Sequence, residues 1–154
     1  MKKAIVFIGP IFAGFLVGFL GSLVQASSIA EWYPFLEKPA LTPANSVFPV
    51  AWGVLYVLAG LSMGFILLRD AKYKRTLVTL FAAQLLLNFL WCLVFFGWRN
   101  PAAGLVIIVA LLAILLVYAI LAWSDARWSA LLIIPYILWV AFATYLNAYI
   151  WLHN

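Results

Sequence analysis

The stretch AAGLVIIVALLAILLVYAILAW, residues 102–123, decides the fold of this chain. None of its residues is charged, and none carries an amide side chain. A helix needs about 20 apolar residues to cross the hydrocarbon core of a bilayer, because each residue adds about 1.5 Å along the helix axis. The stretch therefore predicts a transmembrane helix.

The composition of the whole chain agrees with a membrane protein. The chain has 154 residues, of which 69% are hydrophobic and 8% charged. Ordinary globular domains carry about 25% charged residues, and a small soluble domain needs them to cover its surface. The net charge of +5 does not indicate a nucleic-acid binder, because the basic residues are spread between apolar runs. One cysteine and one histidine exclude a disulfide framework and a Cys/His metal cluster, and we expect no metal and no resident cofactor.

Four further apolar segments are long enough to cross a membrane, and all charged residues lie outside them. The first is longer than the apolar part of a signal peptide, so we expect it to be retained. We predict an all-α membrane protein with a single transmembrane domain over residues 1–154. Its five-helix bundle should have helices near 5–27, 46–68, 76–97, 102–123 and 128–151.

The connection between the first two predicted helices is long, whereas the other three are short and suit antiparallel neighbours. It carries Pro34, Pro39 and Pro43, which restrict the backbone and predict a stiff, external lid loop. Basic residues favour the cytoplasmic side of a membrane. With five spans, seven of the nine Lys and Arg residues lie on the same side of the membrane as the N-terminus. This predicts a cytoplasmic N-terminus and an external C-terminus in a plasma membrane. These seven are Lys2, Lys3, Arg69, Lys72, Lys74, Arg75 and Arg127.

No titratable Asp, Glu, Lys, Arg or His lies inside a predicted span, which disfavours acid–base catalysis and ion-coupled transport. Amides and aromatic rings instead recur at helical spacing on three predicted helices. Buried amides in hydrocarbon need partners, so these faces should point into the bundle, beneath the loop that carries Trp32 and Tyr33. They predict an aromatic-walled small-molecule cavity. The faces are Phe48, Trp52, Leu55 and Tyr56; Gln84, Asn88, Trp91 and Phe95; and Trp139, Phe142, Ala143, Leu146 and Asn147.

Other interpretations stay open at this point. Packing between helices alone accounts equally well for the tryptophans and amides inside the spans. Gly14 and Gly18, continued by Ser22, form a small-residue face that suits either a neighbouring helix of the same chain or a homodimer. Four tryptophans at span ends are typical of the membrane interface: Trp98, Trp123, Trp128 and Trp151.

Several motifs, spread over residues 10–151, resemble the tryptophan-rich sensory protein family, which includes the mitochondrial translocator protein (peripheral benzodiazepine receptor). The first is Trp32-Tyr33-Pro34-Phe35-Leu36-Glu37-Lys38-Pro39, followed by Thr42-Pro43, Phe48-Pro49, Trp52-Gly53, Leu55-Tyr56 and Gly60. The predicted third and fifth helices add Gln84-Leu85, Leu87-Asn88, Trp91, Phe95-Phe96-Gly97, Pro135-Tyr136, Trp139, Ala141-Phe142 and Leu146-Asn147.

The resemblance implies a commonly dimeric five-helix bundle that binds protoporphyrin IX and benzodiazepine- or isoquinoline-type drugs under its first loop. It also implies light-dependent oxidative degradation of bound porphyrin, with Trp32, Tyr33 and Trp139 as the catalytic aromatics. Residues implied to line the pocket are Trp52, Asn88, Ala143 and Leu146, and the faces described above add Tyr56, Gln84, Trp91, Phe142 and Asn147.

Two departures from the family pattern stand out. Ala44 replaces a proline of the family pattern in the loop. His153 stands near the position where the cholesterol-recognition pattern of animal members has Arg or Lys, which argues against sterol as a ligand. We expect a bacterial tetrapyrrole-binding membrane protein with membrane lipid around it. The alternatives are a passive porphyrin transporter or exporter, and a porphyrin sensor that acts through a partner docked on the basic loop 72–75.

Overall fold

A computed structural model describes residues 2–154, with side chains from Ile5 onward, and this part of the chain folds into five long helices without a strand. Each helix is long and apolar enough to cross a membrane, so the five predicted spans are confirmed. The side chains of the basic pair Lys2-Lys3 lie outside the described part. The helices are α1 (Lys2–Glu31), α2 (Val47–Leu67), α3 (Lys74–Cys92), α4 (Pro101–Asp125) and α5 (Arg127–His153).

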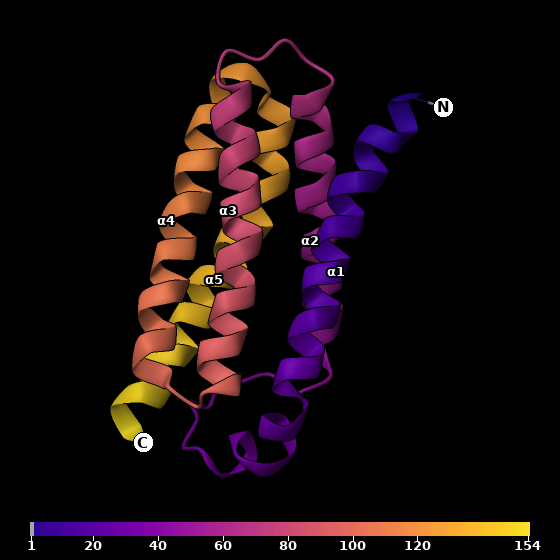
Figure 1. Ribbon diagram of the computed structural model, residues 1–154. Helices are drawn as coiled ribbons and strands as arrows, with labels where there is room; N and C mark the ends of the chain where they lie inside the picture. The colour runs from indigo at the N-terminus through magenta and orange to yellow at the C-terminus, as the bar shows by residue number, and fades with distance from the viewer. Residues whose placement is uncertain (1) are drawn as a thin grey trace.

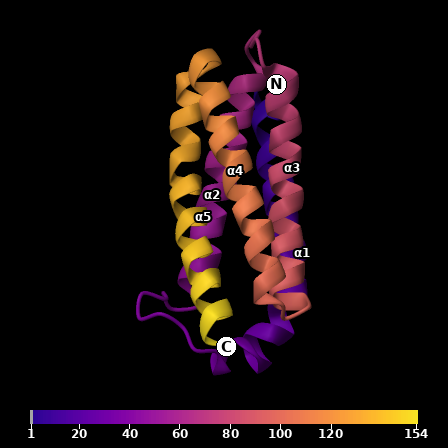
Figure 2. The ribbon, with the colours of Figure 1, turned by 90° about the vertical axis from the view of Figure 1, so that its left-hand side faces the viewer.

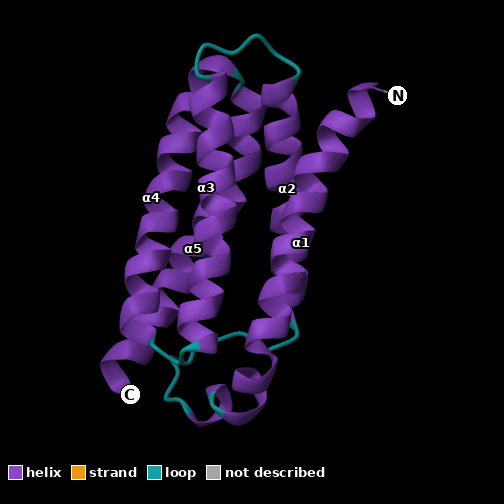
Figure 3. Cartoon of the chain, in the orientation of Figure 1, coloured by secondary structure: helices purple, strands orange, loops and turns teal. Residues whose placement is uncertain are grey.

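The helices form a ring around the bundle axis (Figures 1 and 2). α1 packs against α2 and α3, α4 lies between α3 and α5, and α2 contacts α5. The long connection, residues 32–46, lies at the same end as the C-terminus, and Figure 3 shows the α2–α3 loop at the opposite end. We call these the loop end and the far end.

Two helix ends, those of α1 and α3, differ from the prediction by four residues or more, and the other boundaries by at most three. α1 continues to Glu31, one turn beyond the predicted end at residue 27, because residues outside the hydrocarbon can still be helical. The predicted third helix ends in a wider π-helical turn, Leu93–Gly97, in which the Trp98 N–H donates to the Leu93 carbonyl at 2.9 Å. α4 then begins at Pro101, where the Asn100 side chain caps the Ala103 N–H at 3.0 Å.

The larger packed core lies between α2, α3, α4 and α5 and extends from the far end past the middle of the bundle. Fully buried apolar side chains of these helices meet there, among them Met63, Ile66, Leu77, Leu115 and Ile133. The hydroxyls of Ser62 and Tyr118 lie 3.0 Å apart, and Ser62 donates to the Ser129 carbonyl at 2.9 Å, so both hydroxyls have partners inside this core. A smaller buried apolar cluster, formed by Tyr33, Cys92, Phe95, Phe96 and Ile150, packs at the loop end. The loop-end half of the bundle also holds the candidate site.

The small-residue face of α1 contacts the same chain. A Cβ atom added at Gly14 would lie 2.9 Å from the Tyr56 Cβ, and one at Gly18 would collide with the Tyr56 ring. The two glycines thus let α1 approach α2 at Tyr56. The sequence left two partners open for this face, a neighbouring helix of the same chain or a second copy of the chain. The structure shows the contact with a helix of the same chain.

Candidate functional site

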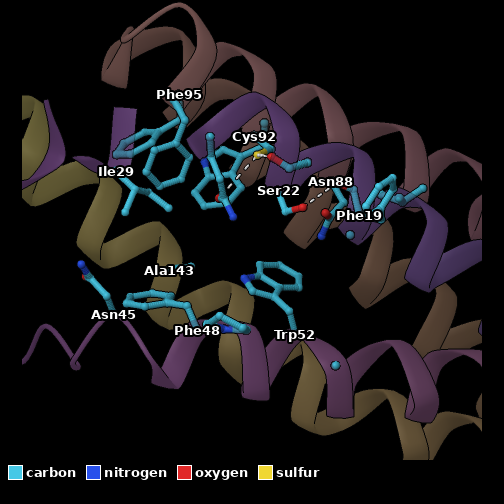
Figure 4. Close-up of a pocket in the computed structure, with 18 of the residues that line it drawn as sticks. Phe19, Ser22, Ile29, Asn45, Phe48, Trp52, Asn88, Cys92, Phe95 and Ala143 are labelled. Carbon is cyan, nitrogen blue, oxygen red and sulfur yellow. Dashed lines mark hydrogen bonds between the residues drawn. The ribbon is translucent and has the colours of Figure 1, made fainter. Parts of the chain in front are cut away.

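A cavity of about 370 Å³ lies at the loop end between α1, α2, α3 and α5 (Figure 4). Its wall is mostly apolar and aromatic with a few polar side chains, as is usual for small-molecule sites. From α1 and the loop come Phe15, Val17, Gly18, Phe19, Gly21, Ser22, Gln25, Ile29, Tyr33 and Asn45. From the other helices come Phe48, Pro49, Trp52, Gly53, Tyr56, Asn88, Trp91, Cys92, Phe95, Phe96, Ala143, Leu146, Asn147 and Ile150.

Two stacked pairs of aromatic rings dominate the wall. On α2, Trp52 stacks on Tyr56 with ring centroids 5.8 Å apart, and Trp91 of α3 stacks on Phe95 of the following π-helical turn at 5.5 Å. Each pair is spaced four residues apart, which places both rings on one face of a helix. The Trp52 and Trp91 centroids are 6.3 Å apart, so the two pairs meet in one aromatic surface that suits a flat apolar molecule.

Asn88 is the polar hub at the inner end of the cavity. Its Oδ1 accepts from the Tyr56 hydroxyl at 3.2 Å, and its Nδ2 donates to the Tyr136 hydroxyl at 3.0 Å. The Tyr136 hydroxyl in turn donates to Gln84 Oε1 at 2.9 Å. The chain joins α2, α3 and α5 and holds the Asn88 amide in one orientation. A second Nδ2 hydrogen and the free lone pairs of Asn88 and Tyr56 are available to a ligand.

A second amide positions the Trp91 ring. The Trp91 Nε1–H donates to Asn147 Oδ1 at 3.0 Å, and Asn147 Nδ2 donates to the Pro101 carbonyl at 2.7 Å. Gly104 allows this close approach of α4, since a Cβ there would lie 3.1 Å from both Asn147 Oδ1 and the Phe95 Cβ. The indole is thereby held at the cavity wall with its only donor satisfied.

The connection between α1 and α2 supplies two lining residues to the cavity, Tyr33 and Asn45, and hydrogen bonds hold it in place near Tyr33. Tyr33 is buried against Phe96, with ring centroids 5.6 Å apart, and burial raises the pKa of its phenol. Lys38 Nζ donates to the carbonyls of Tyr33 at 2.7 Å and Leu36 at 2.9 Å. The side chain of Asn154 exchanges two hydrogen bonds with the backbone of Glu37, at 2.9 and 3.1 Å. These bonds fix the backbone of the loop next to the lining residue Tyr33.

Comparison with known proteins identifies the family of this chain. The sequence model of the TspO/MBR family matches residues 10–152. The chain belongs to the TspO/MBR family.

Relatives from three kinds of organism match nearly the full chain. The tryptophan-rich protein TspO of Archaeoglobus fulgidus is 39% identical, with 96% of this chain and 95% of the relative covered. The TspO of Chlorobaculum tepidum is 40% identical over 85% of this chain and 84% of its own. The human translocator protein is 31% identical over 88% of this chain and 82% of its own. The protein is therefore a multi-pass membrane protein of this family.

Most of the predicted site residues of this TspO/MBR member come together in the cavity wall. They are Tyr33, Trp52, Tyr56, Asn88, Trp91, Ala143, Leu146 and Asn147. Gln84 lies behind the wall, where Tyr136 separates it from Asn88. Its Nε2 has no hydrogen-bond partner although it is buried.

Trp32, Trp139 and Phe142 lie outside the cavity wall. Trp32 contacts Phe95 edge-on at 5.7 Å, and Trp139 contacts Phe48 edge-on at 5.8 Å and Phe142 at 5.9 Å. Because Phe95 and Phe48 line the cavity, each of the two tryptophans is separated from the cavity by one aromatic ring.

The α1 side of the cavity and Cys92 were not among the predicted site residues. Cys92 lines the wall and donates through Sγ to the Gly21 carbonyl at 3.3 Å. The signal in α1 was weak: Ser22 and Gln25 are its only lining residues with polar side chains, within an otherwise apolar span. Their spacing of three residues puts both on one helical face.

Proposed function

We propose that this protein binds a flat tetrapyrrole of the protoporphyrin IX type in the cavity and promotes its light-dependent oxidative degradation. The observation that carries the proposal is the joined aromatic surface of Trp52, Tyr56, Trp91 and Phe95 beside one oriented amide, Asn88. Such a surface favours a planar ring system with few polar groups. Membership of the TspO/MBR family is consistent with a tetrapyrrole-related role.

In this proposal the macrocycle lies against Trp52 and Trp91, and Asn88 makes the polar contact. The loop acts as a lid through Tyr33. The cavity volume of about 370 Å³ is near the lower end of the range for small-molecule sites, about 300–1,000 Å³. The edge of a wide macrocycle would therefore extend through the open side of the cavity. Smaller benzodiazepine- and isoquinoline-type drugs would fit inside and compete with it.

Light would excite the bound tetrapyrrole, and the protein would supply contacts and orientation. Dissolved oxygen would be the oxidant: it would add across a carbon–carbon double bond of the excited macrocycle, that bond would break, and both oxygen atoms would end in the product. Trp52 and Trp91 line the cavity and would orient the ligand for this step, and an electron that either ring passes to the excited ligand would return to it. Trp32 and Trp139 would act one ring further out, through Phe95 and Phe48.

The test is a titration of purified protein with protoporphyrin IX in the dark, followed by tryptophan quenching, and then illumination, followed by porphyrin absorbance. Trp52→Phe should keep binding and slow the light-driven decay, whereas Trp128→Phe, at an exposed span end, should change neither. Trp32→Phe and Trp139→Phe should slow the decay without altering the dark titration. Decay as fast with lipid alone as with protein would refute the degradation, and porphyrin flux into proteoliposomes in the dark would indicate transport instead.

A further inference from the structure

α1 and α2 are in close contact in the far half of the bundle. A Cβ atom added at Gly60 would lie 2.7 Å from the backbone N and Cα of Ile11. One turn further from the loop end, a Cβ at Gly64 would collide with the ring of Phe7. No lipid chain or ligand can pass between the helices at these two contacts, because backbone and side-chain atoms already touch there.

Toward the loop end the two helices still meet at Tyr56, whose side chain lies against Gly14 and Gly18, and the contact loosens beyond it. At Gly53 the nearest atom to an added Cβ is Phe15 Cε1, at an ordinary contact distance of 3.9 Å. Beyond this point the space between the helices belongs to the cavity, which Ser22 and Gln25 of α1 and Pro49 of α2 line. α1 and α2 thus form a V whose open part is the cavity.

The open part of the V faces outward. Phe15 and Phe19 line the cavity, yet they are 45% and 60% exposed, and Ser22 and Pro49 are exposed as well. All four lie on helices long and apolar enough to span a membrane, so their exposed sides lie at the depth of the bilayer. The opposite wall is closed, since the lining residues Cys92 and Leu146 are buried.

At the loop end the chain is held in place by hydrogen bonds, although the lining residue Asn45 is exposed there. Lys38 and Asn154 hold the loop through the hydrogen bonds described above. Next to it, the Ser28 hydroxyl donates to the Phe96 carbonyl at 2.6 Å, and Arg99 Nε donates to Ser28 Oγ at 3.3 Å. This network joins the end of α1 to the end of α3 over the cavity.

We propose that the cavity opens sideways into the bilayer through a slit between α1 and α2, bordered by Phe15, Phe19, Ser22, Pro49 and Gly53. Its ligands are flat, apolar or amphiphilic molecules dissolved in the membrane, and they enter from lipid rather than from water. The inference goes beyond the proposed function, because it concerns access to the cavity and holds whichever flat molecule the cavity takes.

Cys92 allows a test that needs no tetrapyrrole, since it is the only cysteine and lines the wall opposite the slit. The protein in proteoliposomes is treated with N-(1-pyrenyl)maleimide dissolved in the bilayer, or with a membrane-impermeant sulfonated maleimide on both sides. The thiol adds across the maleimide double bond, so that a C–S bond forms, the proton moves to the neighbouring carbon and nothing leaves. The pyrenyl reagent should label Cys92 and the sulfonated reagent should not, with Cys92→Ser as the blank.

Gly53→Phe should slow labelling by the pyrenyl reagent about tenfold, because the new ring fills the slit. Gly9→Phe is the matched control, since an added Cβ at Gly9 meets no atom within 4 Å, and it should label at the original rate. Ser22→Phe narrows the slit from the α1 side and breaks no contact with another helix, because the Ser22 hydroxyl bonds to the Phe19 carbonyl of its own helix. It should slow labelling too, even if Gly53→Phe does not fold.

Three outcomes would overturn the inference: labelling by the sulfonated reagent as fast as by the pyrenyl reagent, no pyrenyl labelling of the unaltered protein, or a folded Ser22→Phe variant labelled at the full rate. A failure of tetrapyrrole binding would leave all three readouts unchanged, so the two proposals fail independently.

Discussion

At the scale of single residues, Asn88 connects the cavity to the interior of the bundle. Both of its amide atoms have tyrosine partners, and these partners come from two other helices. Removing the amide would leave the hydroxyl of Tyr136 without its donor in a fully buried position. A buried polar group that loses its partner costs more than the bond contributed, so Asn88 matters for stability as well as for a ligand.

We therefore expect Asn88→Leu to lower the free energy of unfolding by about 1–3 kcal/mol and to weaken ligand binding. Thermal unfolding in detergent and the dark porphyrin titration measure the two effects. Thr79→Val is the control, because its hydroxyl bonds only to the Arg75 carbonyl of the same helix and is exposed. Equal unfolding midpoints for the two variants would show that the hydrogen-bonded chain does not stabilise the bundle.

Replacing the glycines of α1 and α2 by alanine should change the free energy of unfolding by different amounts, depending on what the added methyl group meets. Gly60→Ala places Cβ against the backbone of Ile11, which cannot rotate away, and should cost about 1–3 kcal/mol. Gly64→Ala meets only the ring of Phe7, which can move, and should cost less. Gly9→Ala meets nothing and should be neutral or slightly stabilising, because alanine favours the helix. Unfolding midpoints in any other order would contradict this account of the contact.

At the scale of the elements, the helical period correctly predicted which side of each helix faces the interior of the bundle. It did not predict which residues along that side line the cavity and which are covered by another helix. Trp52, Asn88 and Ala143 share inward faces, as their spacing requires. Trp139 belongs to the same stripe of α5 as Ala143, yet it lies where Phe48 at the start of α2 covers it. Where one helix crosses another depends on tilt and on small residues at the crossing, and neither follows from the period of one helix.

The contribution of α1 shows another limit of sequence patterns. Gly14 and Gly18 predicted a close contact without naming the partner, and only the structure identifies it as Tyr56. Ser22 and Gln25 are too few to form a polar face, so nothing in the sequence marked α1 as a cavity wall. Span lengths, in contrast, were predicted closely, because the thickness of the hydrocarbon core imposes them.

The loop between α1 and α2 should depend on two side chains for its order. Asn154→Ala removes both bonds to the Glu37 backbone, and Lys38→Met removes the ammonium group shared by the Tyr33 and Leu36 carbonyls. We expect each variant to increase protease cleavage within residues 36–45 while the unfolding midpoint of the bundle stays nearly unchanged. His153→Ala is the control, because its ring lies on Tyr149 of its own helix. Cleavage no faster than in this control would show that other contacts hold the loop.

At the scale of the whole molecule, the two termini lie at opposite ends of the bundle, as an odd number of spans requires (Figure 1). The far end carries most of the basic residues, including Arg69, Lys72, Lys74 and Arg75. We propose that the far end is cytoplasmic and the loop end external.

Cysteine labelling in whole cells tests this orientation. In a Cys92→Ser background, Asn154→Cys should react with a membrane-impermeant maleimide added outside, and Asp70→Cys should react only after the cells are opened. Both positions are exposed in the structure, so reactivity reports the side of the membrane. The reverse pattern would place the loop in the cytoplasm.

The cavity in the loop-end half of the bundle has a consequence for local opening. Where side chains fill the space between helices, backbone amides exchange with solvent deuterium only when much of the bundle opens, whereas a half built around a cavity opens at lower cost. Amides of α2 near Met63 should therefore exchange far more slowly than those near Trp52, although both lie in the same helix. A bound ligand would fill the cavity and level that gradient.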